Sequence, residues 1–196
     1  MNAKFLIFKT MKTRTFLTLT LLSVVLSFTS CSSDDDASPQ VVNEEEVITT
    51  VIVELSLGTN VITLQSQDLD GDGPNAAVIT PAGGITLNSG TSYTGTIRFL
   101  NELESPAEDI TIEVEDEDDE HQVFFTTNGG LDVNTAYTNF DGNGNPLGTN
   151  FTVTANTASS GTLTFTLIHE PTKPNTGLSD AGGETDIEVT FDVTIN

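Results

Sequence analysis

Two histidines, each beside a glutamate, are the residues of this chain best suited to metal chemistry. Glu120 precedes His121, and Glu170 follows His169. Imidazole nitrogens combined with carboxylate oxygens are ligands that zinc and copper accept. If the two segments lie side by side, the four side chains converge on one ion. The alternative is a pair of separate histidines, each hydrogen-bonded by its neighbours at a strand end.

A second candidate metal site is the segment DLDGDG, which places Asp68, Asp70 and Asp72 at alternate positions before Gly73. This spacing resembles the first half of calcium-binding loops, in which several oxygens converge on the ion and a glycine permits a sharp turn. The twelfth position, where an EF-hand has glutamate, holds Ile79. The segment therefore predicts either a calcium site or a hydrated turn without an ion.

Residues 102–120 form a dense acidic run, with eleven carboxylates in nineteen residues. Like charges packed this closely repel one another, and a bound cation or a basic partner relieves that repulsion. A solvated loop is the alternative. The same region opens with Ser105, Pro106 and Glu108, which match a helix N-terminus, so we expect a short helix over about 106–119. Alternation of Ile110, Ile112 and Val114 leaves a strand as the competing interpretation.

Enzymatic chemistry has little support in the sequence. The chain has no G-x-S-x-G segment and no tryptophan, and its single cysteine has another predicted role. We therefore expect a protein that is not an enzyme. A hydrolase built on paired carboxylates is the alternative, because the chain is rich in acids.

The single cysteine, Cys31, follows a segment typical of a secretory signal peptide. Basic residues precede an apolar stretch at 16–28, which at about thirteen residues is shorter than the roughly twenty of a membrane-spanning helix. Translation starts at Met1 or at Met11. The small residues before Cys31 resemble a bacterial lipobox, in which the signal is cut before the cysteine and the thiol carries lipid, including palmitate-type chains.

The residues after the cysteine, SSDDD, resemble the export signal of Bacteroidota surface lipoproteins. We therefore predict a signal peptide at 1–30, lipidation at Cys31, and an outer-membrane protein that faces the cell exterior. Residues 31–46 are small, polar and acidic, a composition that cannot bury enough apolar area to fold, and they are predicted to be a tether.

Charge is divided sharply at the predicted cleavage point. Four of the six basic residues precede Cys31, and all 29 acidic residues follow it. The predicted mature chain keeps only Arg98 and Lys173, for a formal charge of −27. Such a surface repels nucleic acids and anionic lipid headgroups. We expect no nucleic-acid partner, contact with the membrane through the lipid, and a cation, a basic protein or an outer-membrane receptor as ligand.

Residues 47–196 have the length of one domain and a hydrophobic period of two, which indicates half-buried strands. The last segment alternates best, with Ile187, Val189, Phe191, Val193 and Ile195 on one face. The first predicted strand carries Val47, Val51, Val53, Leu55 and Leu57 on one face, and a later one carries Leu163, Phe165 and Leu167. Turn clusters separate further candidates at 61–66, 76–80, 84–88, 92–100, 122–127, 131–138 and 151–156. We predict an all-β fold, an immunoglobulin-like antiparallel β-sandwich.

Several segments together resemble a family of small Bacteroidota lipoproteins: NEEEVITTV, QDLDGDGPNA, LNELESPAEDI, DEHQVFF, IHEPTK and AGGETDIEVTFDVTI. Some members are labelled type 1 periplasmic binding fold proteins, a fold of two α/β lobes that this chain is too short to form. The resemblance brings no site residues. The sequence thus favours an acidic surface lipoprotein that acts as a binding or accessory module for a cation such as calcium or zinc, with a hydrolase or a structural surface protein as alternatives.

Overall fold

The computed structural model describes residues 46–71 and 73–196, which lie in one compact unit, Glu44–Asn196. The predicted signal peptide, Cys31 and Asp72 lie outside the described residues. Within these ranges, no helix is long and apolar enough to cross a membrane.

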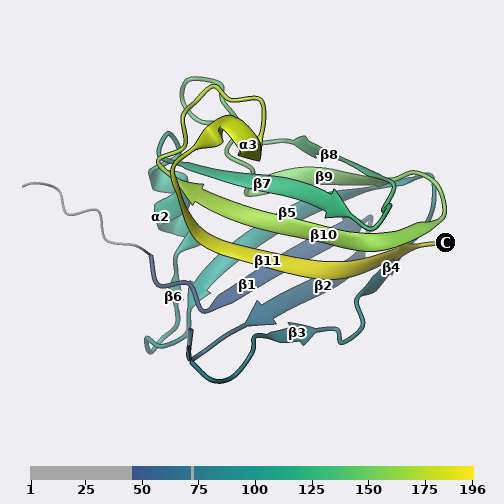
Figure 1. The fold of residues 1–196 in the computed structure, drawn as a ribbon, viewed down its shortest axis with the longest axis horizontal. Coiled ribbons are helices and arrows are strands. Elements are labelled where there is room, and N and C mark those ends of the chain that lie inside the picture. Colours follow the sequence, from purple (N-terminus) through teal and green to yellow (C-terminus); the bar gives the residue numbers. More distant parts are fainter. Residues whose placement is uncertain (1–45, 72) are drawn as a thin grey trace, which may run out of the picture. The chain divides into compact units, whose positions relative to one another are not determined.

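Two sheets pack face to face and confirm the predicted all-β sandwich (Figure 1). The larger sheet has the order β3-β2-β1-β5-β9-β8, with β6 beside β5, and the smaller has the order β4-β11-β10-β7. Neighbouring strands are antiparallel except β4 and β11, which are parallel. The strands are β1 (Thr50–Leu57), β2 (Asn60–Gln67), β3 (Val78–Thr80), β4 (Ile85–Leu87), β5 (Thr91–Asn101), β6 (Glu108–Asp109), β7 (His121–Asn128), β8 (Val133–Tyr137), β9 (Asn150–Ala155), β10 (Ser159–His169) and β11 (Glu184–Ile195).

The core forms because alternate residues of each strand point between the sheets. Val53, Leu163 and Phe191 are fully buried, as their alternation predicts. Val47 and Leu57, which were expected on the buried face of the first strand, are exposed because they lie outside or at the end of β1. Aromatic rings fill the centre, with Phe151 and Phe165 at a centroid distance of 5.6 Å.

The predicted helix exists but is shorter than 106–119. Helix α2 (Thr111–Asp116) begins only after β6, because Glu108 and Asp109 pair with β5. The Thr111 hydroxyl then accepts a hydrogen bond from Phe99 N at 2.9 Å and fixes the first turn. The second short helix, α3 (Leu178–Ala181), was not predicted, and it covers a small apolar cluster on the outer face of the smaller sheet.

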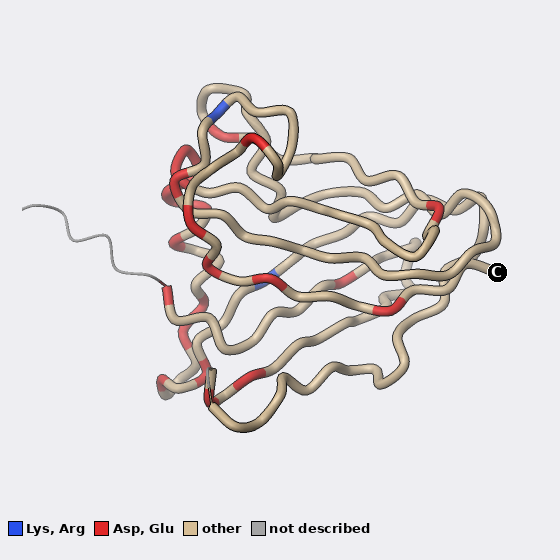
Figure 2. Tube along the Cα trace, in the orientation of Figure 1, with Lys and Arg blue, Asp and Glu red and all other residues tan. Residues whose placement is uncertain are grey.

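One end of the sandwich collects several chain segments that are distant in sequence (Figure 1). Strand β10 ends there at His169, β7 begins there at His121, and β11 begins there at Glu184. Helix α2 and the residues before β1 lie at the same end. Figure 2 shows that most of the described acidic residues also gather there.

Candidate metal centre

The two histidines of the chain lie opposite each other in the smaller sheet. His121 of β7 pairs with His169 of β10, and their rings stack with centroids 4.6 Å apart and planes 20° apart. Each shares the parity of an inward-facing neighbour, Val123 or Leu167, so both imidazoles point between the sheets. Both are buried, at 0% and 3% exposure. The sheet register thus brings together the two histidines that the sequence singled out.

Glu46 reaches this pair from the residues that precede β1. Its Oε1 lies 2.9 Å from His121 Nε2, and its Oε2 lies 3.9 Å from His169 Nδ1. The Glu46 side chain is 6% exposed, and Oε2 has no hydrogen-bond partner among the described residues. A buried carboxylate therefore spans both imidazoles.

Asp186 joins the cluster through an irregularity of β11. Leu167 pairs with Ile187 while Ile168 pairs with Thr185, so Asp186 is the extra residue of a β-bulge. A bulge redirects the side chain at its position. Gly183, at φ +75°, allows the chain to approach the backbone of β10 at His169, where a Cβ would collide. One ligand atom from each of Glu46, His121, His169 and Asp186 lies within 4.8 Å of the others.

The orientation of the His121 ring suits metal ligation. Its Nδ1 lies 3.3 Å from the carbonyl oxygen of Glu117, which can only accept a hydrogen bond. With the proton on Nδ1, the lone pair of Nε2 can ligate an ion at the cluster; without an ion, the 2.9 Å contact of Nε2 with Glu46 Oε1 is a hydrogen bond. This pattern, a backbone carbonyl behind one imidazole nitrogen and a ligand position before the other, is common in metal centres.

Lysine and arginine do not neutralise Glu46. In residues 46–196 the sequence has only Arg98 and Lys173. Arg98 pairs with Asp109 at 2.8 Å. Lys173 donates hydrogen bonds to the carbonyl oxygens of Asp118 and His121, each at 2.6 Å, and so holds the turn before β7 in place.

A second group of ligand atoms shares His169 with the first. It consists of Glu117, Glu120 and His169. His169 Nε2 lies 3.9 Å from Glu120 Oε2, and this nitrogen is buried without a hydrogen-bond partner in the part of the chain that the structure describes. Glu117 is exposed, and the Glu120 side chain is 54% exposed. The two groups thus lie on the two sides of one imidazole.

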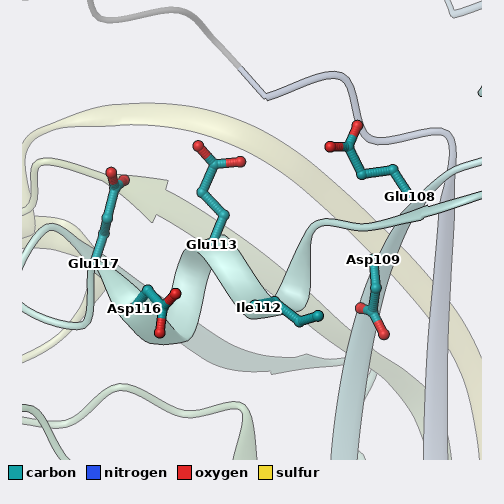
Figure 3. Close-up of a pocket in the computed structure, with 6 residues that line it drawn as sticks. All are labelled: Glu108, Asp109, Ile112, Glu113, Asp116 and Glu117. Atoms are coloured by element: carbon teal, nitrogen blue, oxygen red, sulfur yellow. The ribbon is translucent and has the colours of Figure 1, made fainter.

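An open acidic pocket of about 480 Å³ lies along α2, beside this second group. Figure 3 shows Glu113 and Glu117 on one side of the helix, with Asp116 on the other. Burial, together with the negative charges of Glu117, Glu46 and Glu108, raises the pKa of Glu113. The pocket is lined by Glu108, Asp109, Ile112, Glu113, Asp116 and Glu117.

The predicted transition-metal set is therefore only partly assembled. His121 and His169 meet, and Glu120 faces the outer nitrogen of His169. Glu170 belongs to neither ligand group of the described residues: its side chain is exposed, and its backbone N–H bonds Glu120 O at 2.7 Å. Glu46 and Asp186 were missed, because composition places Glu46 in the predicted tether and no pattern marks a bulge.

The predicted calcium segment is described only in part, because Asp72 lies outside the described residues. Asp70 Oδ2 accepts a hydrogen bond from Asn75 Nδ2 at 2.6 Å, and Asp68 Oδ1 accepts one from Asp70 N at 3.3 Å. The hydrogen bond from the Asn75 side chain lowers the pKa of Asp70, and this effect is larger than the opposing effect of burial. In the described residues these carboxylates close a turn, and the calcium site stays a prediction.

Asp141 is a further buried carboxylate near this end, and hydrogen bonds and one ion pair satisfy it. It accepts hydrogen bonds from Asn143 N at 2.9 Å, from Asn145 N at 2.8 Å and from Asn145 Nδ2 at 3.0 Å, and Lys173 Nζ lies 3.5 Å away. Burial alone raises the pKa of Asp141, but the hydrogen bonds and the Lys173 charge outweigh it and hold this pKa below the ordinary 3.8.

This lowered pKa predicts the effect of Asp141→Asn on acid stability. The Asp141 carboxylate stabilises the fold fully above its unfolded pKa, and the benefit is lost as pH falls through the lower folded pKa. We expect Asp141→Asn to cost about 1–3 kcal/mol at pH 7 and to show a shallower fall in stability below about pH 4. Urea unfolding between pH 3 and 7 measures both. The prediction is contradicted if the stability of Asp141→Asn falls as steeply at acid pH as that of the parent or of the exposed control Asp192→Asn.

Comparisons with known proteins return no match for this chain among family models, curated proteins or solved structures. The resemblance to Bacteroidota lipoproteins stays a prediction.

Proposed function

We propose that this chain is a lipid-anchored, non-catalytic binding module of the outer membrane whose ligand is a divalent transition-metal ion, zinc or copper. The observation that carries the proposal is the convergence of Glu46, His121, His169 and Asp186 at one end of the sandwich. The lipid anchor and the outward orientation rest on the sequence around Cys31.

The donor set favours a transition metal over calcium. Two imidazole nitrogens and two carboxylate oxygens match the ligands of zinc or copper, whereas calcium takes six to eight oxygens. A tetrahedral shell with bonds of about 2.0–2.1 Å places ligand atoms about 3.3 Å apart. The distance from Glu46 Oε1 to His121 Nε2 is 2.9 Å, and the distance from Glu46 Oε2 to His169 Nδ1 is 3.9 Å. These two values lie on either side of about 3.3 Å.

Charge balance points the same way. Burying the Glu46 carboxylate costs several kcal/mol unless a positive charge compensates it. Arg98 and Lys173, the basic residues of the described chain, have other partners. One bound cation supplies the compensating charge.

The number of donors favours binding over catalysis. Catalytic zinc usually has three protein ligands and keeps a position open for water. Four protein donors fill a tetrahedral shell, so they leave no position for a reacting water. Such a closed shell supports a storage, sensing or structural role for the ion.

Titration of the purified full chain with zinc or copper tests the proposal. Bound ion stabilises the folded state by about 2.7 kcal/mol at a hundred times the Kd. For a domain of this size that corresponds to a rise of about 5–10 °C in Tm. Calcium and magnesium at the same ionic strength provide the control and should give no comparable rise.

Two outcomes contradict the proposal. If Tm depends only on ionic strength, the acidic surface serves solubility, as expected of a structural surface protein. If calcium alone raises Tm, the ligand class is wrong and the Asp68–Asp72 segment becomes the candidate.

A further inference from the structure

We propose that the metal ion reaches the buried centre through an outer cation position formed by Glu117, Glu120 and the Nε2 atom of His169, so that His169 passes the ion inward. This inference rests on the proposed metal-binding function. It concerns how the same centre is loaded and emptied.

The two nitrogens of His169 face different carboxylates. Nδ1 lies 3.9 Å from Glu46 Oε2 in the buried group, and Nε2 lies 3.9 Å from Glu120 Oε2 in the outer group. No other described residue belongs to both ligand groups. His169 is therefore the link between a buried and an exposed set of donors.

The buried Nε2 atom of His169 distinguishes the outer carboxylates from an ordinary acidic cluster. The His169 side chain is 4% exposed, and Nε2 has no hydrogen-bond partner among residues 46–71 and 73–196. A buried polar atom without such a partner costs free energy, so a ligand at that atom is favoured. Glu117 and Glu120 are exposed and place oxygens where an ion from solvent first arrives.

Imidazole chemistry makes the two positions alternatives. A neutral imidazole has one lone pair and one N–H, so His169 ligates an ion through one nitrogen at a time. With the ion outside, Nε2 is the ligand and the proton is on Nδ1, facing Glu46. With the ion inside, Nδ1 is the ligand and Nε2 carries a proton that faces Glu120. During transfer the Nδ1 proton passes to solvent by way of the Glu46 carboxylate that it faces, and Nε2 takes a proton from solvent beside the exposed Glu120, so the ring stays neutral and no net proton is released.

The pocket along α2 supplies the electrostatic approach to the outer position. Glu117 lines this pocket and also belongs to the outer ligand group. Figure 3 shows its carboxylate on the same side of the helix as that of Glu113. Acidic surfaces of this kind raise the local cation concentration and the rate of capture.

Replacing both outer carboxylates tests the route. Cobalt(II) is the probe, because its visible absorption reports a tetrahedral site, and stopped-flow mixing gives the rates of binding and release. In the full chain, Glu117→Gln with Glu120→Gln is expected to slow both rates by about tenfold or more. Because a route acts in both directions, the Kd should change by less than about threefold, the equivalent of about 0.7 kcal/mol.

Glu104→Gln with Asp119→Asn is the matched control. It removes two charges from the same acidic run, at exposed residues outside both ligand groups and outside the pocket along α2. At 0.15 M salt, screening weakens the effect of charges that do not contact the ion, so this control should stay close to the parent in both rates. If the control slowed binding and release equally, the effect would be general electrostatic attraction, and the route would be overturned.

The failures of the two proposals are distinguishable. A parent chain that binds no cobalt, zinc or copper refutes the metal-binding function and the route with it. A parent chain that binds, with an outer variant that loads and releases at parental rates, refutes the route alone. A Kd weakened only through faster release would make Glu120 a supporting hydrogen-bond partner of His169 instead of a step on the way in.

Discussion

Replacing His121 with alanine is expected to weaken zinc binding by more than about a hundredfold and to remove the zinc-dependent rise in Tm. Loss of a residue that only supports a ligand costs about 10- to 100-fold in metal affinity, and His121 is proposed as a ligand itself. The other histidine of the chain, His169, is already a proposed ligand, so no further imidazole can replace His121. Competition with a chromophoric chelator measures the Kd.

The variant also leaves a cavity, because His121 is fully buried. A loss of about 2–4 kcal/mol in the ion-free protein is therefore expected. Each variant is compared with itself, with and without zinc, so that this cost cancels. Circular dichroism and the ion-free Tm confirm that the sandwich still folds.

Glu46 and Glu170 provide a matched pair of carboxylate variants. Glu46 lies 2.9 Å from His121, whereas the exposed Glu170 belongs to neither ligand group of the described residues. Glu46→Gln should weaken zinc binding by at least about tenfold, and Glu170→Gln should leave it near the parental value. If the two variants weakened zinc binding equally, the affinity would depend on general negative charge, and the proposed centre would be contradicted.

The longer strands could be predicted from sequence because apolar residues recur at every second position along them. In β10 and β11, residues such as Leu163 and Phe191 alternate with polar ones, and a period of two is typical of half-buried strands. Helix α2 starts later than the local signal predicts, because Glu108, a good N-terminal helix residue, pairs with β5 instead. Tertiary pairing overrode a local signal that spans only a few residues.

The candidate site was predictable only where it follows from strand alternation. His169 continues the parity of Leu167, so its inward direction is visible in the sequence. Its pairing with His121 depends on register, which no local pattern specifies. Asp186 enters through a bulge, and Glu46 lies in a segment whose composition predicts a tether. Contacts of this kind arise only when distant segments pack together.

Replacing Cys31 with serine is expected to abolish incorporation of labelled palmitate and, when a cleavable secretory signal takes the place of residues 1–30, to release the chain from the membrane. A buried acyl CH₂ contributes about 0.8 kcal/mol, and two or more chains are needed for stable anchoring. The formal charge of −27 after Cys31 is repelled by anionic headgroups, and no described helix can span a bilayer.

The measurement has two parts, because an uncut signal segment would itself hold the variant in a membrane. Palmitate labelling compares the parent, Cys31→Ser and the neighbouring control Ser33→Ala, and only Cys31→Ser should lose the label. Fractionation then uses Cys31→Ser behind an ordinary cleavable secretory signal in place of residues 1–30. This released chain should still bind zinc with the parental Kd, because the proposed ligands all lie at Glu46 and beyond. A labelled Cys31→Ser variant, or a parent whose Cys31 sulfur carries no lipid by mass spectrometry, contradicts the anchor and leaves the metal centre to be judged by itself.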